Sequence, residues 1–300
     1  MKLIIEDTIE QYEELFSIDK KRDREYYYRY SIMKPFEQMW NTINVPLKAK
    51  QPNGYDVIMA TNMLGYLNMS DTEMGREALK NLKEIQALQT AEHTLNDCIH
   101  FIKKNNVKIR AEELRFGLYI ADPNTLKLQK GYCGFGGIPG FIHVVLYPNS
   151  YNIPRLPAVI AHEFHHNIRF SYFDWDHGNV TVGDYLIIEG LAESFARELY
   201  GEALLGPWVT SFNQEDLEYS IEVIKGSLNI KGFAEVSSYM FGDTIATEQG
   251  YQPVGLSPFA GYAVGYQAVQ SFMKANQVGI KEATLLSTDE ILNNCELFSN

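Results

Sequence analysis

The sequence has few cysteines, no long apolar run and little positive charge. Its three cysteines are odd in number and widely spaced, and no C-x-x-C pair occurs: Cys98, Cys133 and Cys295. This pattern argues against a disulfide framework and against a thiolate zinc site. No stretch approaches the roughly 18 apolar residues of a membrane span. The apolar residues 3–5 are followed at once by two acids, so we expect no signal peptide and a reducing, cytoplasmic location.

The charge balance is acidic. Lys and Arg together number 26 against 38 Asp and Glu, which gives a formal net charge of -12 at pH 7. Nucleic acids and anionic membranes are bound by basic patches, so we expect neither as a partner. Hydrophobic residues make up 45% of the 300, a balance typical of a globular protein that is long enough to bury a core.

Helical periodicity dominates both ends of the chain. Residues 6–45 and 71–104 carry apolar residues at helical spacing, and helices dominate again from residue 154. Between them, residues 115–120 and 141–147 have the character of strands. We therefore expect an α+β fold, mostly helical, with a small antiparallel sheet before the third helical part. We divide the chain into a helical region of unassigned role, 1–105, and a second domain, 106–300, which carries the motifs described below.

Residues 131–140 are rich in glycine. The segment has neither the Lys-Ser/Thr pair of a phosphate-binding loop nor a helix directly after it. We interpret it as a loop between two antiparallel strands.

Residues 162–166 read His-Glu-Phe-His-His, an H-E-x-x-H motif. On a helix, His162 and His166 lie on one face and can bind one zinc ion. Glu163 is one residue away, where its carboxylate can act as general base toward a metal-bound water. Val159, Ile160 and Phe164 supply an apolar face. The alternative is a helix that carries core or surface histidines without a metal.

A catalytic zinc ion usually has three protein ligands, so a third should follow on another helix. Thr181 and Asp184 can cap such a helix, and Gly201 can end it. Glu189 and Glu193 lie four residues apart on it, and two buried carboxylates need partners. We predict Glu189 as the third ligand, and Glu193 as acceptor for a ligand histidine N–H. The alternative is a solvated face, supported by Arg197 four residues after Glu193.

The order H-E-x-x-H and then Glu-Gly-x-Ala resembles the gluzincin metallopeptidases, and in particular the YjaZ-like family of predicted zinc-dependent proteases. The resemblance covers roughly residues 110–300 and includes HEFHHNIR, EGLAE, FGD, GYAVGY and DEILNNCELF. It implies a gluzincin-like catalytic domain that holds one Zn²⁺ per chain on His162, His166 and Glu189. The separation of the second and third ligands is longer than in aminopeptidase-type relatives.

The resemblance also implies a hydrogen-bond donor to the oxyanion. Tyr262 in Tyr-x-x-Gly matches that pattern, Tyr266 and His177 are reserve candidates, and the alternative for both tyrosines is core packing. His165 lies on a different face from the two ligand histidines, so we predict that it packs or supports a ligand and does not bind the metal. The strand 141–147 precedes the zinc helix, where the resemblance implies an edge strand that binds substrate.

The sequence therefore predicts zinc-dependent hydrolysis of a peptide or protein substrate. An alternative is a non-catalytic peptide-binding or chaperone-like module that retains a zinc site. A third reading is a zinc hydrolase of small non-peptide amides, which would have a narrow closed pocket.

Overall fold

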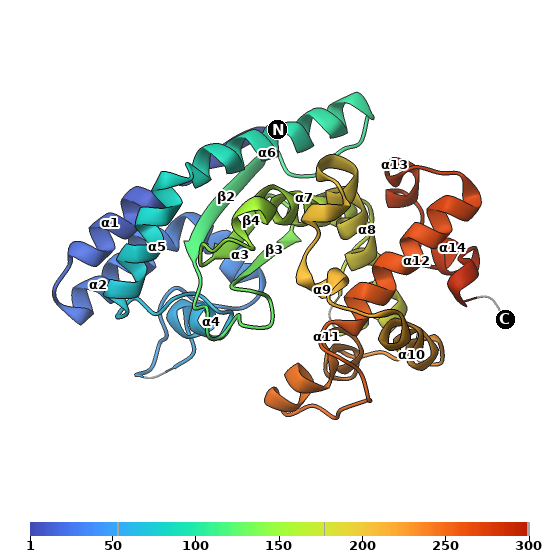
Figure 1. Cartoon of the computed structure of the whole chain (residues 1–300). Coiled ribbons are helices and arrows are strands. Elements are labelled where there is room, and N and C mark those ends of the chain that lie inside the picture. Colours follow the sequence, from blue (N-terminus) through green and yellow to red (C-terminus); the bar gives the residue numbers. More distant parts are fainter. Residues whose placement is uncertain (53, 177, 299–300) are drawn as a thin grey trace. The chain divides into compact units, whose positions relative to one another are not determined.

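The computed structural model describes residues 1–52, 54–176 and 178–298 (Figure 1). The chain divides into two compact units. Unit 1 comprises residues 1–99 and 109–163, and unit 2 comprises residues 100–108 and 164–300. The division falls inside one continuous helix, α7 (Leu156–Tyr172), which carries the H-E-x-x-H motif. A functional boundary at residue 105 stays a prediction.

A four-stranded mixed sheet forms the centre of unit 1. Its spatial order is β1-β2-β4-β3, with β1 parallel to β2, β2 parallel to β4, and β3 antiparallel to β4. The bounds are β1 (Lys2–Ile5), β2 (Glu113–Ile120), β3 (Tyr132–Ile138) and β4 (Phe141–Leu146). The expectation of an antiparallel sheet was therefore right only for the β3–β4 pair. The glycine-rich segment, predicted as a loop, is strand β3.

Within the described residues, six α-helices lie between β1 and β2 in the sequence. Their bounds are α1 (Thr8–Ser17), α2 (Lys21–Tyr27), α3 (Glu37–Thr42), α4 (Val57–Met63), α5 (Thr72–Glu84) and α6 (Ala87–Lys104), the last of which continues into unit 2. A π-helical segment, Tyr28–Ile32, and a 3₁₀ turn, Lys34–Phe36, join α2 to α3. Helices α1 and α5 pack on each other and on β2. This confirms mostly helical structure in residues 6–45 and 71–104.

His143 on β4 is surrounded by aromatic side chains. Its ring is packed against Phe36, Trp40 and Tyr119, and its Nδ1 is 2.7 Å from the Tyr66 hydroxyl. Burial lowers the pKa of His143 to about 3, so the ring is neutral at ordinary pH. This histidine therefore belongs to the core of unit 1.

Unit 2 is helical. It contains the C-terminal part of α7, then α8 (Val182–Tyr200), α9 (Pro207–Thr210), α10 (Gln214–Lys225), α11 (Phe233–Glu248), α12 (Ala260–Asn276), α13 (Ile280–Thr284) and α14 (Thr288–Asn293). As predicted, α8 starts after Thr181, whose hydroxyl accepts from the Asp184 N–H while the Asp184 carboxylate accepts from the Thr181 N–H. It ends at Gly201, which has φ 87°.

Helices α8 and α12 run side by side and cross at two glycines (Figure 1). A Cβ atom on Gly190 would overlap the Gly265 carbonyl oxygen, and one on Gly265 would overlap the Leu186 carbonyl oxygen. Farther along both helices, Gln270 of α12 forms hydrogen bonds with Ser194 and Arg197 of α8. Later residues of α12 thus meet later residues of α8, so the two helices run in the same direction. The glycines therefore let the backbones approach closely and hold α8 in place.

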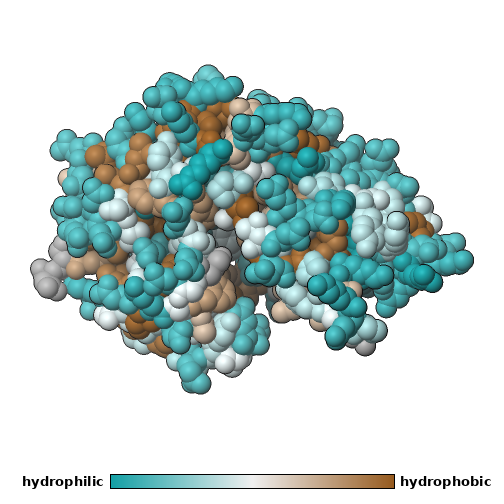
Figure 2. All heavy atoms as spheres, turned by 180° about the vertical axis from the view of Figure 1, so that it is seen from behind, coloured by the Kyte–Doolittle hydropathy of each residue, from teal (hydrophilic) through white to brown (hydrophobic). Residues whose placement is uncertain are grey.

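Hydrophilic residues cover most of the face drawn in Figure 2. No helix in the described ranges is both long enough and apolar enough to span a bilayer.

Candidate metal centre

Helices α7 and α8 bring three buried side chains together. One ligand atom from each of His162, His166 and Glu189 lies within 4.8 Å of the others. The Nε2 atom of His166 is 3.5 Å from a carboxylate oxygen of Glu189. His162 and His166 lie one turn apart on α7, so the helix itself sets their spacing. The structure thus gathers the three residues that the sequence singled out as ligands.

The donor set fits zinc. Two imidazole nitrogens and one carboxylate oxygen are a ligand combination of catalytic zinc sites, and three protein ligands leave one coordination position open. All three residues are buried, at 4–6% exposure, where a carboxylate needs a positive partner. A divalent cation would supply that charge.

Glu163 packs against strand β3. A Cβ atom on Gly134 would overlap the Glu163 side chain, and one on Gly136 would overlap the Glu163 backbone carbonyl. These two glycines therefore let β3 pass directly beside the predicted base. Alternate glycines in a strand mark such a close approach, and this was the signal in the glycine-rich segment that the loop prediction overlooked.

Cys133 is the neighbour of Gly134 on β3. Burial, and to a lesser extent the charge of Glu163, raises the pKa of the Cys133 thiol to about 12. The thiol is therefore protonated at ordinary pH and is a poor nucleophile. We assign it no part in the chemistry.

The prediction of residues 141–147 as the edge strand was wrong. Strand β4 pairs with β2 on one side and with β3 on the other, so it has no open edge. Strand β3 is the edge of the sheet on this side. The continuous burial of Ile142–Leu146 is the mark of an interior strand.

Glu193 lies one turn after Glu189 on α8 and is 1% exposed. The indole Nε1–H of Trp208 on α9 donates to its Oε1 atom. This hydrogen bond satisfies one oxygen of the buried carboxylate, for which the sequence analysis expected a partner. Its predicted role as acceptor for a ligand histidine stays a prediction.

The three candidate oxyanion donors have different settings. Tyr262, on the first turn of α12, is half-buried and its ring contacts Phe241 and Phe259. Tyr266 is buried, and desolvation raises its pKa to about 12 although Arg197 opposes the shift. His177 lies outside the described residues. The choice among the three stays a prediction.

Similarity to known proteins agrees with this geometry. Residues 87–293 match the model of a family described as "Predicted Zn-dependent protease (DUF2268)". The chain belongs to this family. It is 62% identical over 299 residues to the uncharacterized protein YjfC of Bacillus subtilis (strain 168), and the match covers all of both chains.

A second relative confirms the YjaZ-like assignment of the sequence analysis. The uncharacterized protein YjaZ of Bacillus subtilis (strain 168) is 29% identical over 138 residues, which are 45% of this chain and 49% of that protein. No solved structure matches the chain.

The region shared with the family extends into the C-terminal helices, and two residues of the motif helix contact them. The Nε2 atom of His165 lies 2.9 Å from the Thr284 hydroxyl. Arg169 donates from Nη1 to the carbonyl oxygens of Thr284 and Leu286, at 2.7 and 2.5 Å, and its guanidinium covers the Phe173 ring. His165 thus packs away from the ligand face, as predicted, and with Arg169 fastens the end of α13 to α7.

We expect Thr284→Val to lower the free energy of unfolding by about 1–3 kcal/mol, because the buried His165 nitrogen loses its hydroxyl partner. Thermal unfolding measures the change. Thr247→Val, at an exposed site on α11, is the matched control and should be nearly neutral. Equal midpoints for the two variants would show that the His165 contact contributes nothing.

Proposed function

We propose that this chain is a zinc-dependent peptidase. The observation that carries the proposal is the buried group of His162, His166 and Glu189, with Glu163 on the same helix directly after the first ligand. This combination corresponds to three ligands and a general base. The family description, a predicted zinc-dependent protease, supports the same class of reaction.

His162, His166 and Glu189 would hold one Zn²⁺ per chain. When bound, zinc acts as a Lewis acid toward a carbonyl oxygen and lowers the pKa of water. In the gluzincin-type mechanism that we propose, the carboxylate of Glu163 takes a proton as the nucleophile forms and delivers it to the leaving amine. Tyr262 donates its hydroxyl hydrogen to the oxyanion, with Tyr266 and His177 in reserve.

We further propose that the peptide binds along the outer edge of β3. Among the residues that the structure describes, β3 is the last strand in the order β1-β2-β4-β3, where an extended substrate could add to the sheet as a further strand. Gly134 and Gly136 place this edge beside Glu163. Within the described residues the three cysteines form no disulfide, which is compatible with the cytoplasm as the compartment we propose.

Zinc analysis tests the metal site. We expect about one zinc per purified chain, and loss of that zinc in His162→Ala and in Glu189→Ala, because each removes one of three ligands. The matched controls are His93→Ala, whose side chain is 83% exposed, and Glu198→Ala, exposed on α8. Both should keep the metal. Zinc that is absent from the wild type, or unaffected by Glu189→Ala, would rule out this ligand set.

Peptide hydrolysis must then be tested separately from metal binding. Bound zinc with no cleavage of a peptide library would favour the alternative of a non-catalytic peptide-binding or chaperone-like module. Cleavage of small amides with no action on peptides would favour the third reading.

A further inference from the structure

A row of aromatic rings begins at the candidate ligand His166. The His166 and Phe170 rings are stacked, with centroids 5.9 Å apart and an interplanar angle of 16°. Phe170 then contacts Trp175 at 5.3 Å, and Trp175 contacts Tyr185 at 5.3 Å. The row continues from Tyr185 to Phe241 at 6.1 Å. We call these four rings after His166 the aromatic row: Phe170, Trp175, Tyr185 and Phe241.

The row is only partly explained by packing. Tyr185 and Phe241 lie against a buried cluster of unit 2 that includes Val182, Leu186 and Val236. Trp175, however, lies on the connection between α7 and α8 and is not part of that cluster. Trp175, Tyr185 and Phe241 are half-buried residues, whereas Phe170 is buried at 8% exposure. A contiguous set of partly exposed rings is typical of a binding surface.

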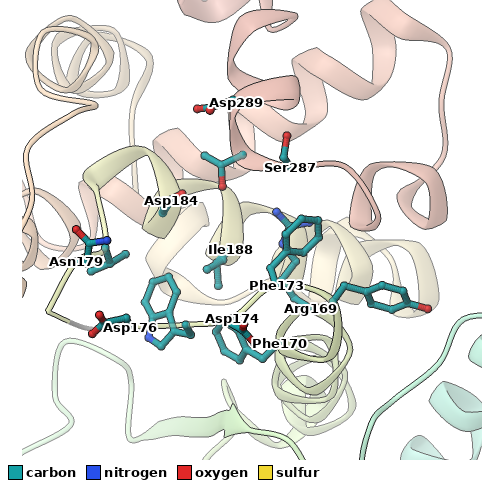
Figure 3. A pocket seen from close by; sticks show the side chains of 14 residues that line it. Arg169, Phe170, Phe173, Asp174, Asp176, Asn179, Asp184, Ile188, Ser287 and Asp289 are labelled. Atoms are coloured by element: carbon teal, nitrogen blue, oxygen red, sulfur yellow. The ribbon is translucent and has the colours of Figure 1, made fainter.

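A hollow of about 440 Å³ is lined in part by Phe170 and Trp175 of this row (Figure 3). Its apolar lining includes Phe170, Trp175 and Ile188, and Ile188 directly precedes the candidate ligand Glu189. Figure 3 shows Phe170 and Ile188 on the walls of this hollow, with Asp174, Asp176, Asp184 and Asp289 also lining it. Arg169 lines the hollow as well, so the hollow combines apolar walls with four carboxylates and one guanidinium, and its charged lining is negative on balance.

We propose that the aromatic row is the specificity surface for the peptide, and that it takes a large aromatic side chain adjacent to the scissile bond. The inference rests on the proposed peptidase function. A peptide bound at His166 has the stacked Phe170 ring as its neighbour, so a substrate ring can extend the series. Ring-to-ring contact adds to the free energy of burying the side chain. Acidic side chains are disfavoured because the four aspartates outnumber Arg169 among the charged groups that line the hollow.

The test uses blocked pentapeptides Gly-Ala-X-Ala-Gly with X as Phe, Ala, Lys or Asp. Calorimetry measures their binding to the zinc-loaded Glu163→Gln protein, so that turnover does not interfere. We expect the Phe peptide to bind about 10–100-fold more tightly than the Ala peptide, the range for filling an apolar pocket. In the Glu163→Gln protein, the further substitution Trp175→Ala should reduce the ratio of Phe-peptide to Ala-peptide affinity to near one, whereas Trp175→Phe should retain most of this preference. Unchanged zinc content and thermal midpoints establish that the variants are folded.

Tryptophan fluorescence locates the binding. The chain has three tryptophans, and Trp40 and Trp208 are buried while Trp175 is half-buried. The Phe peptide should change the emission of the Glu163→Gln protein and of its Trp40→Phe derivative, but not of its Trp175→Phe derivative. Equal binding of the Phe and Ala peptides, tighter binding of the Lys peptide, or a preference that survives Trp175→Ala would overturn the inference.

The same peptides separate this inference from the proposed function. Wild-type protein that cleaves the Phe and Ala peptides at the same rate would keep the peptidase function and reject the aromatic specificity. Tight binding of the Phe peptide through Trp175 without cleavage would keep the aromatic row as a peptide-binding surface and reject both the peptidase function and the placement beside a scissile bond.

Discussion

The Glu163→Gln variant is expected to bind zinc at the wild-type level and to lose peptide hydrolysis by roughly 10²–10⁴-fold, the usual contribution of a positioned general base. Glutamine keeps the size of the side chain beside Gly134 but cannot accept the proton. The loss should appear in kcat, because the proton transfer occurs in the transition state. Steady-state cleavage of a peptide library, together with zinc analysis of each preparation, measures both quantities.

Glu112→Gln is the matched control for this variant. Glu112 is exposed in unit 1 and precedes β2, so the same chemical change there should leave hydrolysis unaltered. Wild-type turnover by Glu163→Gln would exclude the mechanism, and loss of zinc together with turnover would mean that Glu163 supports the metal rather than the proton transfer.

The helices that hold this site could be predicted because their signals are local. His162 and His166 are related by a single helical turn, and the zinc helix was therefore correctly placed from spacing alone. Thr181 and Asp184 cap α8 through side chains only three residues apart. Glu189 then falls on the buried face of a helix whose start and end were both predicted.

The sheet was predicted less well because strand pairing joins distant residues. Strand β1 pairs with β2 more than a hundred residues later, and nothing in residues 2–5 indicates that partner. Strand β3 has a glycine-rich sequence of low strand propensity, and its pairing with β4 and its contact with Glu163 override that propensity. The true edge strand was therefore missed.

The contacts that surround the metal centre were also beyond local patterns. The hydrogen bonds from His165 and Arg169 to Thr284 join residues more than a hundred positions apart. A helical repeat relates only residues a few positions apart, so it could not predict them. The place of Trp175 between Phe170 and Tyr185 depends on how the connection between α7 and α8 folds back. The sequence thus predicted the candidate ligands, whereas the surface proposed to select the substrate required the tertiary structure.

The largest effect on stability is expected for Gly190→Ala, at the crossing of α8 and α12. A single methyl group there overlaps the Gly265 carbonyl oxygen and also meets a methyl of Val269, so the helices must separate. Because the obstacle is backbone, rotation of a side chain cannot relieve it. We expect a loss of about 3 kcal/mol or more in the free energy of unfolding, at the upper end for overpacking. Denaturant unfolding followed by circular dichroism measures it.

Gly226→Ala is the matched control for the crossing. Gly226 has φ -73° at the end of α10, and a Cβ atom there would have its nearest neighbour at 3.9 Å. Alanine fits this position and restricts the unfolded chain, so the variant should be neutral or slightly stabilised. Gly190 is adjacent to Glu189, so separation of the helices should also weaken zinc binding. A Gly190→Ala protein with wild-type stability and full zinc content would show that the close crossing does not support the metal centre.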